Sequence, residues 1–430
     1  MRARLVLVLL AACGGGSDPK PDAAGPTSPT ANATREIVDT KLSFDVTAKT
    51  ATAAVTFGPS DKPGATVEVG DLMFDTVQVG GMDLPTMTAM GKMDLGLPAS
   101  TDPIEVDFAY HWTDHESFTG ASVNGYTLIW PYYCGNLFPC HSQPEDGTTF
   151  SLALSGVPAD KVAVYPTSIP TDAPSYQIAW TMDSYTELPV GTTTAGTQIS
   201  VWYRTGEMAA AQAGSAHLVA AFDWMEKTLG PYRFGPKYSS VSVNWPRGAY
   251  GGMEHHPMSH IASAALGDEE TNVHEAAHGW FGDGIRIACW EDFVLSEGTV
   301  SYLAARALDV VAPSVGAATW QGYMNELNNV SALDPVWPQS CGVVDIIRDN
   351  LFSEAPYMRG AFFYKGVADK VGADQLDLAL HNYFQAHQGA TGHMSEMLDT
   401  IKQVTGYDAT TCAQMWLEQK TSVPTPGPCP

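Results

Sequence analysis

The chain has 430 residues, of which 44% are hydrophobic and 16% are charged, and it contains 40 Gly and 29 Pro. This composition is typical of a folded, loop-rich protein with more than one domain, and it excludes a disordered chain. The formal net charge of −25 excludes a nucleic-acid-binding protein, because a phosphate backbone requires clustered Lys and Arg and only 22 are present. The acidity most simply keeps the protein soluble; the alternative is a mild preference for cationic substrates.

The first residues have the pattern of an export signal, because Arg2 and Arg4 precede an apolar run over residues 5–12 that ends at Cys13. Residues 10–13, Leu-Ala-Ala-Cys, also resemble the lipobox of bacterial lipoproteins, in which the cysteine carries the lipid. We therefore expect a signal peptide over residues 1–12, and a lipidated Cys13 with a flexible linker over residues 13–34. Such a protein is exported to the periplasm or the cell surface and tethered to a membrane. The alternative is an ordinary signal peptide in which Cys13 is incidental.

Residues 35–193 predict a β-sandwich. Over residues 104–112 the large apolar side chains fall on alternate positions, which is the period that places one face of a strand on a core. Leu42, Phe44 and Val46 repeat this pattern. Turn-forming clusters at residues 58–61 and 97–100 separate the runs, as expected between the strands of a sandwich.

Residues 194–430 predict a mainly helical domain after a last strand over residues 198–204. One helix is indicated by apolar residues on a single helical face and by a Gly stop: Leu218, Phe222, Met225, Leu229 and Gly230. Val241 and Val243 alternate with serines in a further strand. Near the C-terminus, Ser395 is expected to cap a helix that stops at Gly406.

The chain has seven cysteines, and setting Cys13 aside leaves six, an even number that is typical of disulfides in an oxidising compartment. Six cysteines allow fifteen pairings. Proximity along the chain favours these pairs: Cys134 with Cys140, Cys412 with Cys429, and by remainder Cys289 with Cys341.

Residues 274–278 read His-Glu-Ala-Ala-His, the HExxH pattern. Helix positions four apart share a face, so His274 and His278 reach one metal ion while Glu275 lies beside the remaining coordination position. Glu297 follows His278 after eighteen intervening residues, a spacing that lets a second helix return a third ligand. Two imidazoles and one carboxylate form an open zinc site with water as the fourth ligand. We therefore expect one zinc ion held by His274, His278 and Glu297.

With these residues in place, the chain resembles the aminopeptidase N family of gluzincin zinc peptidases. Residues 274–302, HEAAHGWFGDGIRIACWEDFVLSEGTVSY, are similar to that family's zinc signature. Residues 251–255, Gly-Gly-Met-Glu-His, resemble its exopeptidase motif, which usually ends in Asn. Residues 356–360, Pro-Tyr-Met-Arg-Gly, resemble the segment of its catalytic tyrosine, with Arg359 where Lys is usual. The likeness runs from about residue 35 to Lys420 and ends where many relatives continue into a large helical domain.

The resemblance implies an α+β fold with an N-terminal antiparallel β-sandwich domain over residues 35–193. A thermolysin-like, mainly α-helical catalytic domain follows over residues 194–430. It also implies two catalytic residues, Glu275 as the proton acceptor and Tyr357 as the hydrogen-bond donor to the oxyanion. The implied substrate-binding residues are Gly251, Gly252, Met253 and Glu254. Among them, the Glu254 carboxylate would hold the free α-ammonium of a peptide.

In the first domain the chain departs from the family pattern. Relatives carry Gln, and two residues later Glu, ahead of the Phe-Pro-Cys segment, and counting back from Cys140 places Leu128 and Trp130 at those positions. Neither side chain accepts a hydrogen bond from an ammonium group. We therefore expect an anchor made of Glu254, aided by His255, with weak substrate binding and a small penalty for blocking the N-terminus of the peptide.

Together these patterns predict a zinc-dependent aminopeptidase of the cell envelope that hydrolyses N-terminal residues from peptides. One alternative is a related zinc hydrolase with a relaxed requirement for the free amine. Another is a non-catalytic surface binding protein on the same fold, against which the intact Glu275 and Tyr357 count. Asp292 either orients a zinc ligand or has a structural role. His255, His256 and His260 lack ligand spacing, so no second metal is expected there.

Overall fold

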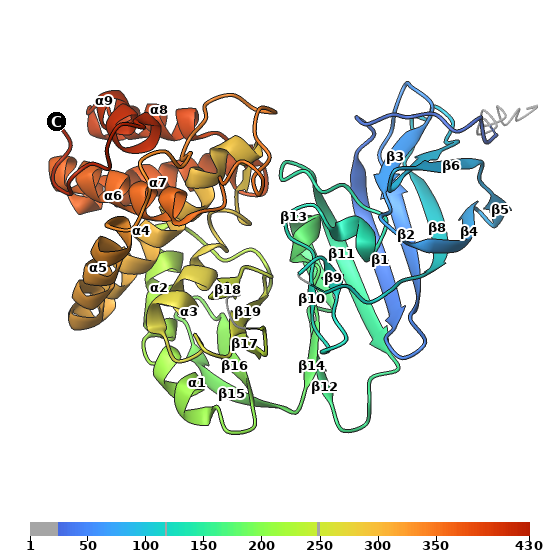
Figure 1. The fold of residues 1–430 in the computed structure, drawn as a ribbon, viewed down its shortest axis with the longest axis horizontal. Coiled ribbons are helices and arrows are strands. Elements are labelled where there is room, and N and C mark those ends of the chain that lie inside the picture. The colour runs from blue at the N-terminus through green and yellow to red at the C-terminus, as the bar shows by residue number, and fades with distance from the viewer. Residues whose placement is uncertain (1–24, 117, 247–249) are drawn as a thin grey trace, which may run out of the picture.

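The computed structural model describes residues 25–116, 118–246 and 250–430, arranged in two lobes (Figure 1). The predicted signal peptide and Cys13 lie outside the described residues. Within them, no helix has both the length and the apolar character needed to cross a membrane. The first lobe is built of strands and the second is mainly helical, which confirms the predicted α+β fold class.

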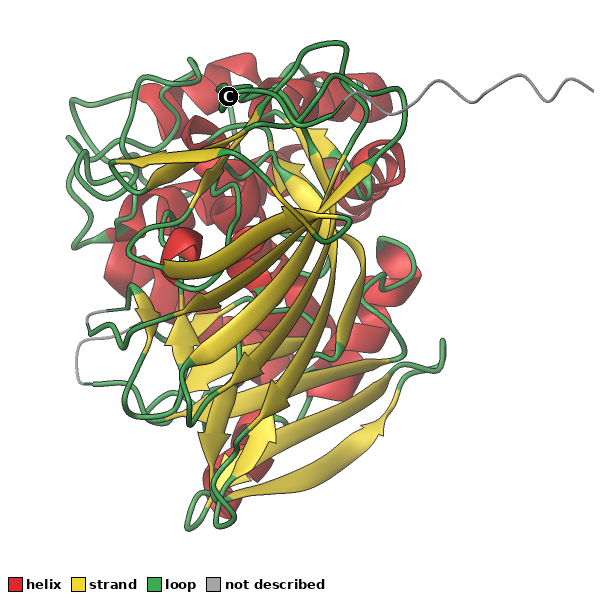
Figure 2. Cartoon of the chain, turned by 90° about the vertical axis from the view of Figure 1, so that its right-hand side faces the viewer, coloured by secondary structure: helices red, strands yellow, loops and turns green. Residues whose placement is uncertain are grey.

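A seven-stranded sheet forms the first lobe, and Figure 2 shows its strands in front of the helices of the second lobe. In spatial order its strands are β13 (Ser168–Pro174), β11 (Gly147–Ser155), β1 (Ile37–Asp45), β2 (Thr50–Phe57), β8 (Ile104–His111), β4 (Met73–Val79) and β5 (Met82–Asp83). β8 coincides with the predicted strand, and its alternate residues are buried. The sheet is not purely antiparallel as predicted, because β1 and β11 pair in parallel. The long excursion of the chain between these two strands allows that crossover.

A three-stranded sheet packs with the large sheet in one continuous core, to which Val55 and Leu95 both belong. Its strands are β3 (Ala65–Glu68), β7 (Lys92–Leu95) and β6 (Thr86–Ala89). Two further strand pairs complete the lobe: β9 (Gly120–Ala121) with β10 (Thr127–Leu128), and β12 (Val162–Val164) with β14 (Thr181–Asp183).

The second lobe begins with a five-stranded sheet. In spatial order its strands are β15 (Tyr185–Thr192), β16 (Gln198–Arg204), β17 (Lys237–Val243), β19 (Met258–Ala262) and β18 (Gly252–Met253). The predicted boundary at residue 193 remains a prediction, although β15 precedes it and pairs with β16 of this sheet. β18 lies at the edge of the sheet, antiparallel to β19. A short pair, β20 (Arg286–Ile287) with β21 (Thr391–Gly392), lies among the helices.

The helices of the second lobe follow the apolar patterns of the sequence. They are α1 (Met208–Gly214), α2 (Leu218–Thr228), α3 (Glu269–Ala277), α4 (Phe293–Val311), α5 (Pro313–Leu327), α6 (Glu354–Val371), α7 (Ala373–His387), α8 (Met394–Thr405) and α9 (Thr410–Ala413). α8 stops at Gly406 in the left-handed conformation, as predicted. The predicted cap Ser395 is wrong, because the N-cap is His393, whose side chain forms a capping box with Glu396.

Three disulfides join the predicted partners and confirm the proximity argument. Cys134 with Cys140 closes a turn of the first lobe, and Cys412 with Cys429 fixes the C-terminal tail. Cys289 with Cys341 links the start of α4 to the loop between α5 and α6. None of the six lines the candidate site described below.

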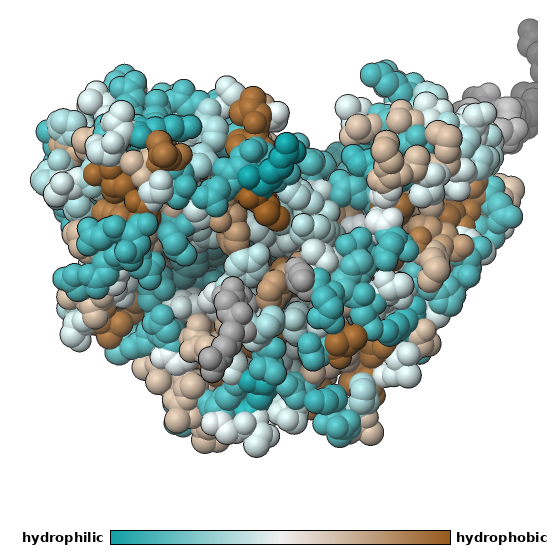
Figure 3. All heavy atoms as spheres, in the orientation of Figure 1, coloured by the Kyte–Doolittle hydropathy of each residue, from teal (hydrophilic) through white to brown (hydrophobic). Residues whose placement is uncertain are grey.

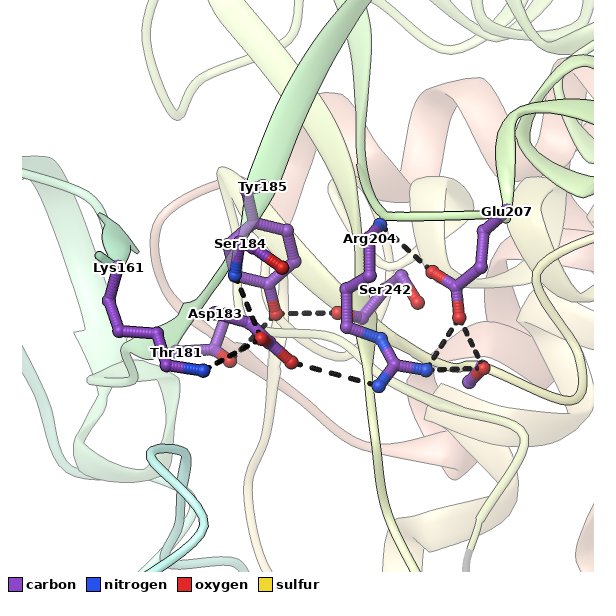
Figure 4. Close-up of polar contacts among 9 residues, drawn as sticks. Lys161, Thr181, Asp183, Ser184, Tyr185, Arg204, Glu207 and Ser242 are labelled. Carbon is purple, nitrogen blue, oxygen red and sulfur yellow. Dashed lines mark hydrogen bonds and ion pairs between the residues drawn. The ribbon is translucent and has the colours of Figure 1, made fainter.

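A polar network joins the two lobes where the chain passes from β14 to β15 (Figure 4). Asp183 accepts a hydrogen bond from Lys161 at 3.0 Å and lies 3.7 Å from the Arg204 guanidinium, which also donates to Ser263 Oγ at 2.7 Å. Burial alone would raise the pKa of Asp183, but the Lys161 and Ser184 hydrogen bonds and the Arg204 charge hold it below its ordinary value. The network therefore ties the strands of the first lobe to the sheet of the second.

The lobes also meet beside the candidate site. Arg286, which is buried, donates to the carbonyl oxygens of Asp172 at 3.0 Å and Glu145 at 3.2 Å, both in the first lobe. The ring centroid of Trp130 in the first lobe lies 5.8 Å from that of Trp290 and 4.5 Å from that of Phe352, both in the second lobe. A notch between the two lobes is visible at the top of the space-filling view (Figure 3).

Candidate metal centre and cleft

The HExxH residues lie at the C-terminal end of α3, as predicted for a helix, with His278 as its C-cap. The helix begins after Asp268, whose side chain accepts a hydrogen bond from the Glu270 backbone N–H at 3.2 Å. His274 and His278 are one turn apart on the face that turns inward, and both are buried. The acidic first turn therefore fixes the helix that presents both imidazoles.

Three donor atoms converge at this face. His274 Nε2 lies 3.1 Å from Glu297 Oε2 and 3.3 Å from His278 Nε2, and His278 Nε2 lies 3.4 Å from Glu297 Oε2. A tetrahedral ion with bonds of about 2.0–2.1 Å separates its donors by roughly 3.3–3.4 Å, because a tetrahedron's edge is about 1.6 times its centre-to-corner distance. The three side chains therefore fit a tetrahedral metal of zinc type.

A backbone carbonyl orients one of the imidazoles. His278 Nδ1 lies 3.1 Å from the Phe281 carbonyl oxygen, so this nitrogen carries the proton and Nε2 is left to bind a metal ion. Burial alone would raise the pKa of Glu297, but the adjacent imidazoles of His278 and His274 lower it to about 2. Glu297 is thus held as a carboxylate, the form that binds a metal.

Glycines bring the helices of Glu297 and Tyr357 together. A Cβ on Gly360 of α6 would lie 2.5 Å from the Gly298 Cα of α4, so only glycine permits this approach. The Tyr357 ring consequently stacks beside the His274 imidazole, with ring centroids 6.0 Å apart. Burial first, and then the charge of Glu297, raise the pKa of Tyr357 well above its ordinary value. Tyr357 therefore keeps its phenolic proton and remains a hydrogen-bond donor.

The edge strand β18 forms the opposite wall. A Cβ on Gly252 would lie 2.3 Å from Glu275 Oε1, so glycine is required for the strand to pass this close. Glu275 Oε2 is buried without a hydrogen-bond partner, and burial raises the pKa of Glu275 well above its ordinary value. Carboxylate oxygens of Glu254 and Glu275 and a nitrogen of His278 lie within 4.8 Å of one another.

Glu254 closes the inner end of the site. Its exposed fraction is 5%, and burial raises its pKa, an effect that the charge of His278 opposes. Behind it, the buried Asp283 accepts a hydrogen bond from Tyr176 of the first lobe at 3.0 Å. Burial, reinforced by the charge of Glu254, raises the pKa of Asp283 well above its ordinary value.

All nine residues predicted for the site line one cleft of about 440 Å³. These residues are Gly251, Gly252, Met253, Glu254, His274, Glu275, His278, Glu297 and Tyr357. Sequence reasoning did not assign functions to other residues of the same cleft: Trp130, Tyr250, Glu270, Thr271, Ser301, Tyr323, Glu326, Phe352, Ser353, Glu354 and Met358. Glu270 and Glu354 could have been predicted from the sequence. Each precedes a predicted site residue, His274 and Tyr357 respectively, at a spacing that places both on the same helix face.

Two residues of the motifs considered in the sequence analysis, Asp292 and Arg359, do not line the cleft. Asp292 accepts hydrogen bonds from the Met394 N–H at 3.0 Å and the Trp337 indole at 3.2 Å, so its role is structural. Arg359 donates to the carbonyl oxygens of Trp416 and Gln419 and holds the C-terminal segment.

Around the amine anchor, one expectation fails. His255 does not assist Glu254, because its ring is buried against His260, 4.6 Å away, and is not part of the cleft lining. Leu128 is fully buried and also absent from the lining, whereas Trp130 lines the cleft.

Part of the chain matches a known family model, and curated aminopeptidases are similar to it in sequence. Residues 216–416 match the Peptidase family M1 domain. Leucine aminopeptidase 2 of Neosartorya fischeri is 24% identical over 72% of this chain and 55% of its own length. Aminopeptidase M1-B of Oryza sativa is 22% identical over 79% of this chain and 42% of its own length. The chain thus spans about half the length of the curated relatives it matches.

Solved structures confirm the two-lobed fold. The M1 zinc metallopeptidase from Deinococcus radiodurans superposes with a TM-score of 0.78 and 18% identity, covering 93% of this chain and 97% of that chain. A variant of that metallopeptidase bound to a Tyr-Ser-Ala substrate superposes with a TM-score of 0.77 and 18% identity, covering 91% and 96%.

Proposed function

From the match of residues 216–416 to the Peptidase family M1 domain, we propose that the protein is a zinc-dependent aminopeptidase of this family that removes N-terminal residues from peptides. The observation that carries the proposal is the convergence of His274, His278 and Glu297 donor atoms beside an unpaired Glu275 oxygen. One zinc ion bound by these three residues would lower the pKa of a water molecule to about 7 and polarise the scissile carbonyl.

Glu275 accepts the proton of the attacking water and passes it to the leaving amine. Its free carboxylate oxygen is buried, so no other protein group competes for that proton.

Tyr357 donates a hydrogen bond to the oxyanion that develops on the scissile carbonyl, a contribution of about 3 kcal/mol to the barrier in comparable sites. The edge strand β18, with Gly252 and the preceding Gly251, lies alongside the substrate, which it binds as an added strand. Glu254, at the inner end, pairs with the substrate α-ammonium. A peptide bound in this way presents its first bond to the metal, which makes the enzyme an exopeptidase.

We also propose that the protein is exported and held at a membrane by a lipid on Cys13. The support is the sequence pattern of residues 1–13 together with three disulfides, which form and persist in oxidising compartments. Mass spectrometry of the processed N-terminus tests this, and an unmodified, uncleaved N-terminus in cells would contradict it.

The test of the proposed activity combines metal analysis with an aminoacyl-coumarin panel and N-acetylated controls. We expect about one zinc ion per chain, hydrolysis of the free aminoacyl substrates, and loss of both after treatment with a chelator. Stoichiometric zinc without hydrolysis of any free aminoacyl substrate would contradict the proposal.

A further inference from the structure

Three glutamates line the cleft without a part in metal binding or in the proposed hydrolysis: Glu270, Glu326 and Glu354. They come from three helices, α3, α5 and α6. Glu326 and Glu354 are exposed at the mouth of the cleft, and the Glu270 side chain is 24% exposed. Among the described residues that line the cleft there is no Lys or Arg to oppose the charge of Glu326 and Glu354, whereas Glu270 lies 3.7 Å from the His274 ring nitrogen Nδ1.

A buried hydroxyl lies unpaired in the same wall. Ser301 of α4 is 1% exposed and lines the cleft, yet its Oγ has no hydrogen-bond partner. The hydroxyl of its neighbour Tyr323 donates to the Glu270 carboxylate and lies 3.2 Å from the Ser301 carbonyl oxygen, which places Ser301 beside Glu270. An unpaired buried hydroxyl costs free energy unless a ligand supplies its partner. The Ser301 hydroxyl therefore has unused hydrogen-bonding capacity beside the cleft.

The position of the metal donors decides which part of a peptide reaches this wall. Glu254 lies on the His278 side of the donor triad, within 4.8 Å of His278 and Glu275. Glu270 lies on the other side, with its Oε1 3.7 Å from His274 Nδ1, the ring nitrogen that faces away from the triad. A peptide whose amine is at Glu254 must therefore pass the triad and leave the cleft along Glu270, Glu326 and Glu354.

From this arrangement we infer that the mouth of the cleft binds a cationic side chain, Lys or Arg, on the residue that directly follows the scissile bond. The inference rests on the proposed aminopeptidase function and adds the class of substrate. The three carboxylates attract the cation, and the Ser301 hydroxyl accepts a hydrogen bond from it. A cleft lined by charges of one sign also concentrates oppositely charged substrates.

The experiment compares two tripeptides, Leu-Lys-Ala and Leu-norleucine-Ala, with the zinc-loaded, full-length enzyme. Norleucine keeps the apolar stem of lysine and lacks its ammonium group. At low ionic strength we expect kcat/KM to favour the lysine peptide by about tenfold, and the ratio to fall as salt is raised. A ratio of one or less, or a preference unaffected by salt, would overturn the inference.

Variants then locate the effect. The double substitution Glu326→Gln with Glu354→Gln should lower the lysine-to-norleucine ratio several-fold, and Ser301→Ala should lower it to a smaller extent. Glu187→Gln, at an exposed position of β15 away from the cleft, is the matched control and should leave the ratio unchanged. Because the ratio is taken within one preparation, a change in overall turnover or folded fraction cancels.

A double variant with the wild-type ratio would also overturn the inference. Failure of the enzyme to cleave both tripeptides and Leu-coumarin would instead contradict the proposed function on which the inference rests.

Discussion

The inner end and the mouth of the cleft both present glutamates, but in opposite surroundings. Glu254 at the inner end is 5% exposed and is enclosed by β18 and by residues of both lobes, whereas Glu326 and Glu354 at the mouth are exposed and belong to the helical lobe alone. A buried carboxylate with a raised pKa gains most from an ammonium group that replaces its lost solvation. An exposed one exerts a weaker, salt-screened attraction. The difference supports the proposals that the substrate terminus binds at the inner end and that selectivity arises at the mouth.

The largest effect is expected for Glu275→Gln, which removes the proton acceptor between the two ends and keeps the donor triad. Turnover should fall by about a thousandfold while zinc content stays stoichiometric, because general base catalysis contributes factors of this order. Atomic absorption and hydrolysis of Leu-coumarin measure the two quantities. Wild-type turnover in this variant would remove Glu275 from the mechanism.

Tyr357→Phe comes next. The hydrogen bond is made mainly to the transition state, so kcat should fall by about a hundredfold with little change in KM. Steady-state kinetics separate the two constants. A loss confined to KM would assign Tyr357 to substrate binding and so to the inner end of the cleft.

Glu297→Ala removes one of three metal ligands. We expect zinc affinity to fall by at least about tenfold, with activity partly restored by excess zinc. Competition with a chromogenic chelator measures the affinity. Should the variant retain the wild-type zinc content after dialysis against a chelator, the donor set inferred from the 3.1–3.4 Å separations would be wrong.

The smallest effect concerns the junction that places the first lobe against the inner end. Arg204→Met breaks the link between Asp183 and Glu207, and it should lower the free energy of unfolding by about 1 kcal/mol, as for other partly exposed ion pairs. The pKa values of Asp183 and Glu207 are both lowered in the folded state. Their contribution is therefore complete above about pH 4, the ordinary range of carboxylates, and is lost as the pH falls further.

Thermal melts of the wild type and Arg204→Met at neutral pH and at pH 3 measure the contribution of these ion pairs to stability. The difference in melting temperature between the two proteins should be smaller at pH 3. A difference that grows with acid would mean that Asp183 and Glu207 are not the partners through which Arg204 stabilises the junction.

The donor triad was predicted from spacing along the chain, and the wall of the inner end from the resemblance of residues 251–255 to a family motif. His274 and His278 share a helix face, and Gly251 to Glu254 form one short segment, so their arrangement is visible in a linear pattern. The disulfides were predictable for the same reason, since two of the three pairs are close in the chain.

Features that depend on tertiary packing were not predictable. Glu326 reaches the cleft only because α5 packs beside α4, and no spacing relates it to α3. His255 looked like an aid to Glu254 because it is adjacent in sequence, but neighbouring residues of an extended segment point to opposite sides, and its ring turns into the core. Ser395 was predicted as a cap from residue type, and the histidine two residues earlier occupies that position.

The most direct measurement of the central claim is the position at which a free pentapeptide, Leu-Lys-Ala-Phe-Gly, and its N-acetylated form are cut, followed by mass spectrometry over time. With Glu254 closing the inner end, the free peptide should lose single residues from its N-terminus. With Leu128 and Trp130 at the positions where the resemblance leads us to expect Gln and Glu, the acetylated form should be cut only about tenfold more slowly, as expected for the loss of one charged hydrogen bond. Cleavage of both peptides at internal bonds and at equal rates would contradict the account.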